Sequence, residues 1–154
     1  MTEHPIALVE RHILDRAHRA VEHVLARLDV AAEMAGTMGG PELSGLVRDL
    51  LDSVDATLLP HMAWEEQVCF PETDRLAGTP WATRILYLQH AQIRRRLADL
   101  RADRVALHDE PGARRAAHLR GQLYGLHAIL GSHLEQEEHA LLTVLVTAPG
   151  GADS

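Results

Sequence analysis

The sequence predicts an all-α fold, an antiparallel up-down-up-down four-helix bundle. Composition favours helix, because the 154 residues are rich in Leu, Ala and Arg and only five are aromatic. Breaker residues then divide the chain into four long segments, since 36–41, 71–80 and 109–112 interrupt the helical pattern with Gly and Pro. We expect one domain over residues 1–148 and a disordered tail over 149–154.

The four predicted helices span about residues 5–35, 42–70, 80–108 and 112–146. Thr79 is expected to cap the third helix, with Pro80 at its first position. Each helix carries an inward stripe with steps of three and four residues, typical of a helix facing a bundle core. The stripes are Leu14, His18, Val21, Leu25, Leu28; Val54, Leu58, His61, Glu65, Val68; Leu86, His90, Ile93, Leu97, Leu100; and Leu126, Leu130, His133, Glu137, Leu141.

Polar residues on these stripes repeat along the chain. His18 and His61 stand 43 positions apart, as do His90 and His133, and the second copy lies 72 positions after the first. Glu65 follows His61 by four residues, and Glu137 follows His133 in the same way, so each pair shares one helix face. Counted from the predicted turns, the four histidines fall in one layer of the bundle. Buried carboxylates need compensation, so the pattern predicts metal binding rather than a buried polar network. The predicted ligands are His18, His61, Glu65, His90, His133 and Glu137.

Neighbouring residues leave alternatives open. Glu22, four residues after His18, is either an additional ligand or a solvated carboxylate. Tyr87 either points its hydroxyl at the site or, as we expect, packs with a hydrogen bond at the rim. Glu66 and Glu138 are expected to orient ligands from outside or to face solvent. The other histidines are expected at the surface: His4, His12, His23, His108, His118, His127 and His139.

Charge and cysteine content exclude several functional classes. A formal net charge of −7 without a basic stripe argues against nucleic acid and an anionic membrane surface as partners. Cys69 is the only cysteine, which excludes an internal disulfide, a cysteine-based zinc site and an iron–sulfur cluster held by this chain alone. The N-terminus lacks a signal-peptide pattern and no stretch approaches about 20 apolar residues, so we expect a cytoplasmic protein.

A family resemblance rests on His18, the run from His61 to Pro71, His90, and the run from His133 to Glu138. Over about residues 10–146, the chain resembles the hemerythrin-like, or HHE cation-binding, family. The resemblance implies a non-haem di-iron centre joined by two carboxylates and a bridging oxo or hydroxo group, although manganese and zinc suit the same ligands. It implies that Glu65 and Glu137 bridge the metals. His18 and His61 would then serve one iron, and His90 and His133 the other.

One departure from the family pattern bears on function. Oxygen-carrying members present a second histidine four residues after the third-helix histidine, where this chain has Arg94, which cannot ligate a metal. Arg94 is expected to occupy that ligand's position; alternatively, it points to the rim and pairs with a Glu. The remaining ligands resemble those of members linked to iron sensing or to peroxide chemistry.

The predicted function is therefore a di-iron protein that binds or reacts with dioxygen, peroxide or nitric oxide, either as an oxidoreductase or without turnover. A non-catalytic oxygen- or iron-binding sensor or storage protein is the main alternative. A zinc-filled structural bundle is a third possibility, and it would have no redox activity.

Overall fold

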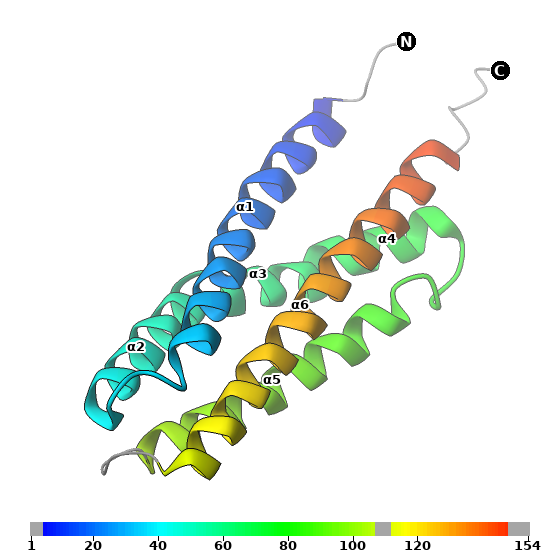
Figure 1. Cartoon of the computed structure of the whole chain (residues 1–154). Coiled ribbons are helices and arrows are strands. Elements are labelled where there is room, and N and C mark those ends of the chain that lie inside the picture. The colour runs from blue at the N-terminus through cyan, green and yellow to red at the C-terminus, as the bar shows by residue number, and fades with distance from the viewer. Residues whose placement is uncertain (1–4, 107–111, 148–154) are drawn as a thin grey trace, which may run out of the picture.

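The computed structural model describes residues 5–106 and 112–147, and the side chains of these residues except 5–14, 142 and 145–147. Four long helical segments run antiparallel to their neighbours, and the described residues contain no strand (Figure 1). The segments are α1 (Pro5–Met34), a composite second helix, α5 (Arg84–Val105) and α6 (Ala113–Thr147). The predicted four-helix bundle is confirmed, whereas the predicted tail 149–154 lies outside the described residues.

The second helix contains two π-helical turns. It consists of α2 (Gly40–Ser53), η1 (Val54–Leu58), α3 (Leu59–Trp64), η2 (Glu65–Cys69) and α4 (Phe70–Ala77). In each π turn the closing N–H bonds five residues back, from Leu59 to Val54 and from Phe70 to Glu65. A proline follows each turn and occupies the first turn of a new α-helical segment, where its missing N–H is tolerated. The predicted end near residue 70 is therefore wrong, because the helix continues through Pro71 to Ala77.

The connection between α4 and α5 also differs from the prediction. Gly78 ends α4 with φ of 68°, a left-handed conformation that favours glycine. The expected cap at Thr79 is wrong, since α5 begins at Arg84 and the Thr79 hydroxyl only accepts a 3.3 Å hydrogen bond from the Trp81 N–H. Asp74 instead closes the connection, because its carboxylate accepts hydrogen bonds from the backbone N–H and the hydroxyl of Thr83 at 3.0 and 3.1 Å.

The apolar core fills the end of the bundle that holds the α1–α2 turn. Both α1 and α5 pack against the second helix and against α6, which places the four segments in cyclic order. Buried residues of the core include Leu28, Leu43, Val47, Leu50, Leu58, Met62, Leu97, Leu100, Leu123, Leu126 and Leu130. One predicted stripe position is wrong: Val68 is 47% exposed, whereas Phe70 is fully buried. The η2 turn causes this, because a π turn brings the fifth following residue, rather than the third, back to the face of Glu65.

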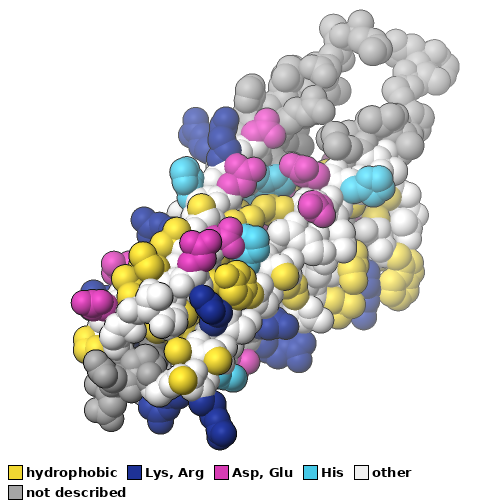
Figure 2. Space-filling model, in the orientation of Figure 1, with side chains coloured by type: hydrophobic (Ala, Val, Ile, Leu, Met, Phe, Trp, Pro, Cys, Tyr) yellow, Lys and Arg dark blue, Asp and Glu magenta, His cyan; other side chains and the backbone are white. Residues whose placement is uncertain are grey.

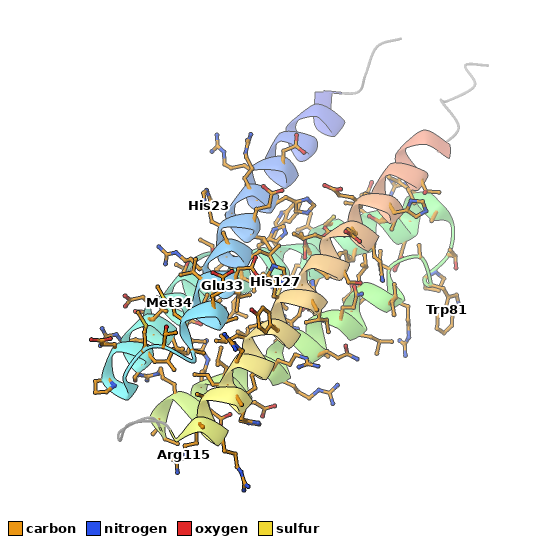
Figure 3. All side chains as sticks on the ribbon, viewed as in Figure 1. His23, Glu33, Met34, Trp81, Arg115 and His127 are labelled. Carbon is orange, nitrogen blue, oxygen red and sulfur yellow. The ribbon has the colours of Figure 1, made fainter. Side chains whose placement is uncertain are left out.

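The surface mixes charged and apolar side chains. On the face viewed in Figure 2, acidic and arginine side chains are interspersed with exposed apolar ones. Trp81 points away from the bundle beside the α4–α5 connection (Figure 3) and is 68% exposed. No helix in the described parts of the chain combines the length and apolarity that crossing a membrane would require.

Candidate metal centre

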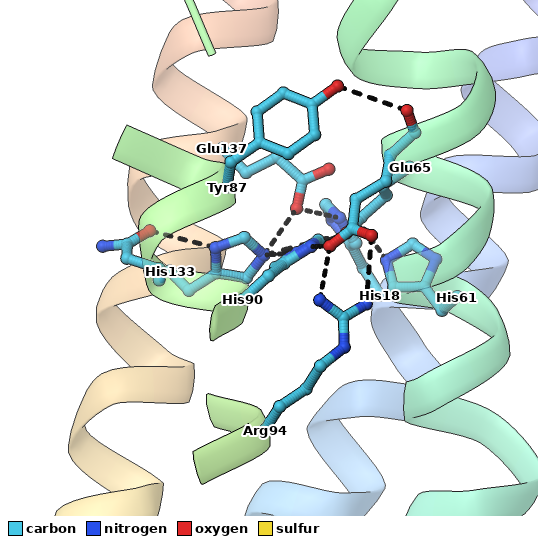
Figure 4. A network of polar contacts seen from close by, with 10 residues as sticks. His18, His61, Glu65, Tyr87, His90, Arg94, His133 and Glu137 are labelled. Carbon is cyan, nitrogen blue, oxygen red and sulfur yellow. Dashed lines mark hydrogen bonds and ion pairs between the residues drawn. The ribbon is translucent and has the colours of Figure 1, made fainter. Parts of the chain in front are cut away.

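The six predicted ligands converge in one buried layer that adjoins the apolar core. α1 supplies one histidine, α3 and η2 a histidine and a glutamate, α5 a histidine, and α6 a histidine and a glutamate (Figure 4). Four of them, Glu65, Glu137, His90 and His133, are at most 2% exposed. His18 is 7% exposed, and the side chain of His61 is also 7% exposed.

Glu65 lies at the centre of this layer. One carboxylate oxygen, Oε1, lies 2.5 Å from His61 Nε2. The other, Oε2, lies 3.0 Å from His90 Nε2 and 3.8 Å from His133 Nε2. Glu65 thus faces the histidine of α3 with one oxygen and the histidines of α5 and α6 with the other.

Glu137 approaches the layer from the opposite helix. Its Oε2 lies 3.4 Å from His18 Nε2 and 3.5 Å from His133 Nε2. Donor atoms close enough to share one ion form two groups. The first group is His18, His61, Glu65 and Glu137, and the second is Glu65, His90 and His133. Glu65 belongs to both groups, and the histidines divide as the family resemblance implies.

Six of the buried donor atoms lack hydrogen-bond partners in the described part of the chain. Both oxygens of Glu65, both oxygens of Glu137, and the Nε2 atoms of His18 and His61 make no hydrogen bond to the described residues. The Nε2 atoms of His90 and His133 face each other at 3.1 Å. Buried polar atoms without partners raise the free energy of the folded state, and a cation bound in this layer would compensate them. Imidazole nitrogens and carboxylate oxygens are a donor set that suits first-row transition metals, and the residues present therefore fit a metal site.

The carboxylates shift each other's protonation. Burial alone would raise the pKa of Glu65, but contacts with His133, His61 and His90 hold it well below its usual range. Burial raises the pKa of Glu137 to about 8, and the adjacent Glu65 adds to this increase, while the contact with His18 opposes it. Without metal, the pair therefore retains a proton at neutral pH, and this proton resides on Glu137.

The pKa values of His18 and His133 are shifted in opposite directions. Burial alone would lower the pKa of His18, yet its contact with Glu137 and the charges of Glu137, Glu65 and Glu138 raise it above the usual value. Burial lowers the pKa of His133 against the opposing pull of Glu65. His133 therefore favours the neutral form that metal binding requires.

The outward ring nitrogens of two histidines are hydrogen-bonded, and that of a third faces a more distant carboxylate. His90 Nδ1 lies 2.7 Å from Glu66 Oε1, and His133 Nδ1 donates to Gln89 Oε1 at 3.0 Å. His18 Nδ1 lies 3.9 Å from the Glu138 carboxylate. A histidine held through one nitrogen presents the other to the metal in a fixed orientation, and here that nitrogen is Nε2.

Arg94 and Tyr87 lie outside this layer. Arg94 donates to both carboxylate oxygens of Glu66, at 2.8 and 3.1 Å, so the expectation that it occupies a ligand's position is wrong and the alternative, pairing with a Glu, is correct. Partial burial alone would raise the pKa of Glu66, but Arg94 and His90 hold it below its usual value. The Tyr87 hydroxyl donates to the Glu66 backbone carbonyl at 3.2 Å, which is the expected rim position (Figure 4).

The remaining predicted residues stay apart from the layer. Glu22 is exposed and belongs to neither donor group. His23, His118 and His139 are exposed, and His127 pairs with Asp29 at 3.3 Å (Figure 3). The surface positions expected for His4 and His108, and for the side chain of His12, lie outside the described residues.

Two features of the site were not foreseen from the sequence. Gln89 is 8% exposed and links His133 to Gln136, to which it donates a 2.9 Å hydrogen bond. Its spacing, three residues after Leu86 and four before Ile93, places it beside the inward stripe and was the available signal. The Trp64 indole stacks on the His61 ring at 6.1 Å, and its spacing of three residues from His61 was the available signal.

Comparison with known protein families agrees with this geometry. A family model described as the hemerythrin HHE cation-binding domain matches residues 9–145. No curated protein and no solved structure gives a significant match to the chain. The matched range contains all six residues of the buried layer, and the chain belongs to the hemerythrin HHE cation-binding domain family.

Proposed function

We propose that the chain is a non-haem di-iron protein in which His18, His61, Glu65, His90, His133 and Glu137 hold two iron ions. The observation that carries the proposal is the set of buried donor atoms arranged in two groups that share Glu65, with both carboxylates and two of the four histidines lacking hydrogen-bond partners at these atoms among the described residues. One ion would lie between His18 and His61, the other between His90 and His133, and the two carboxylates would contact both. When bound, such a pair of ions supplies redox chemistry toward small molecules such as dioxygen, peroxide or nitric oxide.

The surrounding residues fit small ligands and a reactive centre. The layer is buried, and its most accessible part is the His18–His61 side, so access favours ligands of a few atoms. Arg94 replaces the additional histidine of the carriers and turns outward to Glu66, so this chain offers four imidazoles rather than five. Fewer protein ligands leave coordination positions for exogenous molecules.

Anaerobic reconstitution of the metal-free protein with Fe(II) tests this function. We expect two iron ions per chain and a visible spectrum that changes on adding azide, nitric oxide or peroxide. Repeated peroxide consumption would identify an oxidoreductase, whereas a single stoichiometric reaction or reversible binding would identify the carrier or sensor alternative. Retention of zinc alone, with no bound iron under any reducing condition, would contradict the proposal.

A further inference from the structure

The sequence repeat relates the surroundings of His18 to those of His90. A shift of 72 positions maps His18 onto His90 and Glu66 onto Glu138. In the fold, Glu66 approaches the outward nitrogen of His90, and Glu138 approaches that of His18. Each half of the layer therefore has the same arrangement, in which a glutamate from the other repeat lies near the outward nitrogen of the histidine.

The two halves differ in the distance between the glutamate and its histidine. Glu66 Oε1 lies 2.7 Å from His90 Nδ1, whereas Glu138 Oε1 lies 3.9 Å from His18 Nδ1. The Glu66 side chain is 25% exposed and that of Glu138 is 64% exposed. One glutamate is hydrogen-bonded to its histidine, and the other is loosely placed in solvent.

A charge reversal between the repeats coincides with this difference. The same shift of 72 positions maps Glu22 onto Arg94, so the residue four places after each histidine is acidic in one half and basic in the other. Arg94 donates to both oxygens of Glu66 and holds this carboxylate beside His90. At the corresponding sequence position of the first half, the acidic Glu22 has no N–H group that could hold Glu138 in the same way.

The His90–His133 half is also more buried than the His18–His61 half, and its second histidine is hydrogen-bonded as well. His133 is fixed through Gln89, and the His90 and His133 side chains are 0% and 3% exposed. The His18 and His61 side chains are 9% and 7% exposed. A ligand histidine that loses its outer partner typically loses about 10–100-fold in metal affinity.

We propose that the two metal positions are inequivalent and that residues 94 and 22 set the difference. Arg94, acting through Glu66, preorganises the His90–His133 position, which binds its ion first and tightly. Glu22 leaves Glu138 disengaged, so the His18–His61 position binds more weakly and exchanges its ion. Both are positioning residues, and the inference rests on the proposed metal centre.

Stepwise titration of the metal-free protein with Zn(II) tests this order without any reaction at the centre. Calorimetry is expected to resolve two binding steps that differ at least about tenfold in affinity. Imidazole ¹⁵N resonances, assigned with single His→Gln variants, should shift for His90 and His133 in the first step and for His18 and His61 in the second.

Charge variants test whether residues 94 and 22 cause the difference in affinity between the two positions. Arg94→Gln should weaken the first step about tenfold or more, and Arg94→Lys should restore part of the loss because it retains the positive charge. Glu22→Arg should draw Glu138 toward His18 and tighten the second step, so that the two affinities converge. Exposed neighbours provide matched controls: Arg95→Gln and Glu33→Arg make the same charge changes and should alter neither step.

Each failure has a different meaning. Two steps of equal affinity would overturn the inequivalence, initial loading of His18 and His61 would overturn its order, and equal effects of Arg94→Gln and Arg95→Gln would overturn the role of residue 94. Each of these outcomes would leave the metal centre intact. Failure to bind two ions at all would overturn the proposed function and this inference together. Glu22 is exposed and the Arg94 side chain is 43% exposed, so we expect the metal-free variants to keep the helix content of the parent and to unfold cooperatively, and circular dichroism with urea unfolding checks this.

Discussion

Individual side chains in the buried layer have conflicting roles in stability and binding. Glu137 is fully buried, has no hydrogen-bond partner among the described residues and has a raised pKa, so it destabilises the metal-free fold at neutral pH. The same carboxylate attracts cations. We therefore expect substitutions that improve the metal-free protein to impair metal binding.

Substituting either carboxylate separates these two roles. Glu65→Ala and Glu137→Ala should each lose at least one metal ion per chain. Glu137→Leu should also raise the unfolding free energy of the metal-free protein, by about 1–4 kcal/mol, because an apolar side chain replaces an uncompensated polar one. Metal analysis and urea unfolding measure the two effects, with the exposed Glu135→Ala as control. Two tightly bound ions in both alanine variants would remove the bridging assignment.

The pKa of Glu137 predicts the pH dependence of binding. Because that pKa is raised from 4.5 to about 8, the folded metal-free protein holds a proton at pH 7 that a metal must displace. Affinity should rise with pH up to about 8, and binding at pH 7 should release about one proton from this carboxyl. The unfolded chain releases this proton near its usual pKa, so the contribution of Glu137 to metal-free stability is present below pH 4.5 and is lost as pH rises toward 8.

Calorimetry at pH 7 in buffers with different protonation enthalpies counts the released protons. Glu137→Gln removes the titrating group and should lower the count by about one. An unchanged count in this variant would show that the proton resides elsewhere.

At the scale of helices, periodicity predicted most of the bundle but missed the π turns. Steps of three and four residues identify the buried faces of α5 and α6, where every predicted stripe residue is buried. The same rule predicted Val68 in the core, where the structure has Phe70. The prediction failed because a constant α-helical period does not allow for the extra residue in a π turn. Pro71 was taken as a break for the same reason.

The η2 turn also explains one contact at its end. Pro71 has no N–H to donate, and the carbonyl of Glu66, five residues earlier, accepts the hydroxyl of Tyr87 instead. Sequence alone could not supply this contact, because it depends on which carbonyl the wider turn leaves free.

Deleting one exposed residue tests whether η2 is an inserted position. Without Gln67, the distance from Glu65 to Phe70 falls to four residues, so an α-helix keeps both on one face. The variant should fold, but with its unfolding free energy reduced by about 3 kcal/mol, because Pro71 then lies inside a regular helix. Adding Pro71→Ala to the deletion variant should recover the lost unfolding free energy.

Deletion of Gln92 is the matched control, because this exposed residue lies within regular α5. That deletion rotates one half of the buried stripe away from the core and should prevent cooperative unfolding. Circular dichroism and urea unfolding distinguish the variants. If deleting Gln67 also prevents cooperative unfolding, as deleting Gln92 should, then Gln67 does not correspond to one extra residue inserted into an otherwise α-helical segment.

For the whole molecule, the repeat of 72 residues was the strongest signal in the sequence. It brought together six residues from four helices, and all six converge in the structure. What the repeat could not predict is where its two copies diverge, because Arg94 acts through Glu66 of the other half. Such contacts across the bundle depend on packing rather than on spacing along one helix.

Metal should stabilise the entire bundle, because the ligands come from all four helices. Free metal at 100 times its dissociation constant adds about 2.7 kcal/mol per site, or roughly 5–10 °C in the unfolding temperature of a chain this size. Chelation should reverse this increase, as thermal unfolding with and without chelator would show. Magnesium, which prefers oxygen ligands and resists dehydration, should have little effect. Equal stabilisation by magnesium would contradict a site built from imidazoles.

In the proposed centre, two ions lie within the buried layer and share Glu65. Anomalous diffraction from iron-loaded crystals, measured on both sides of the iron absorption edge, tests this claim most directly. We predict two anomalous peaks per chain, one between His18 and His61 and the other between His90 and His133, both adjoining Glu65. A single peak in the layer, or peaks only at surface histidines, would contradict it.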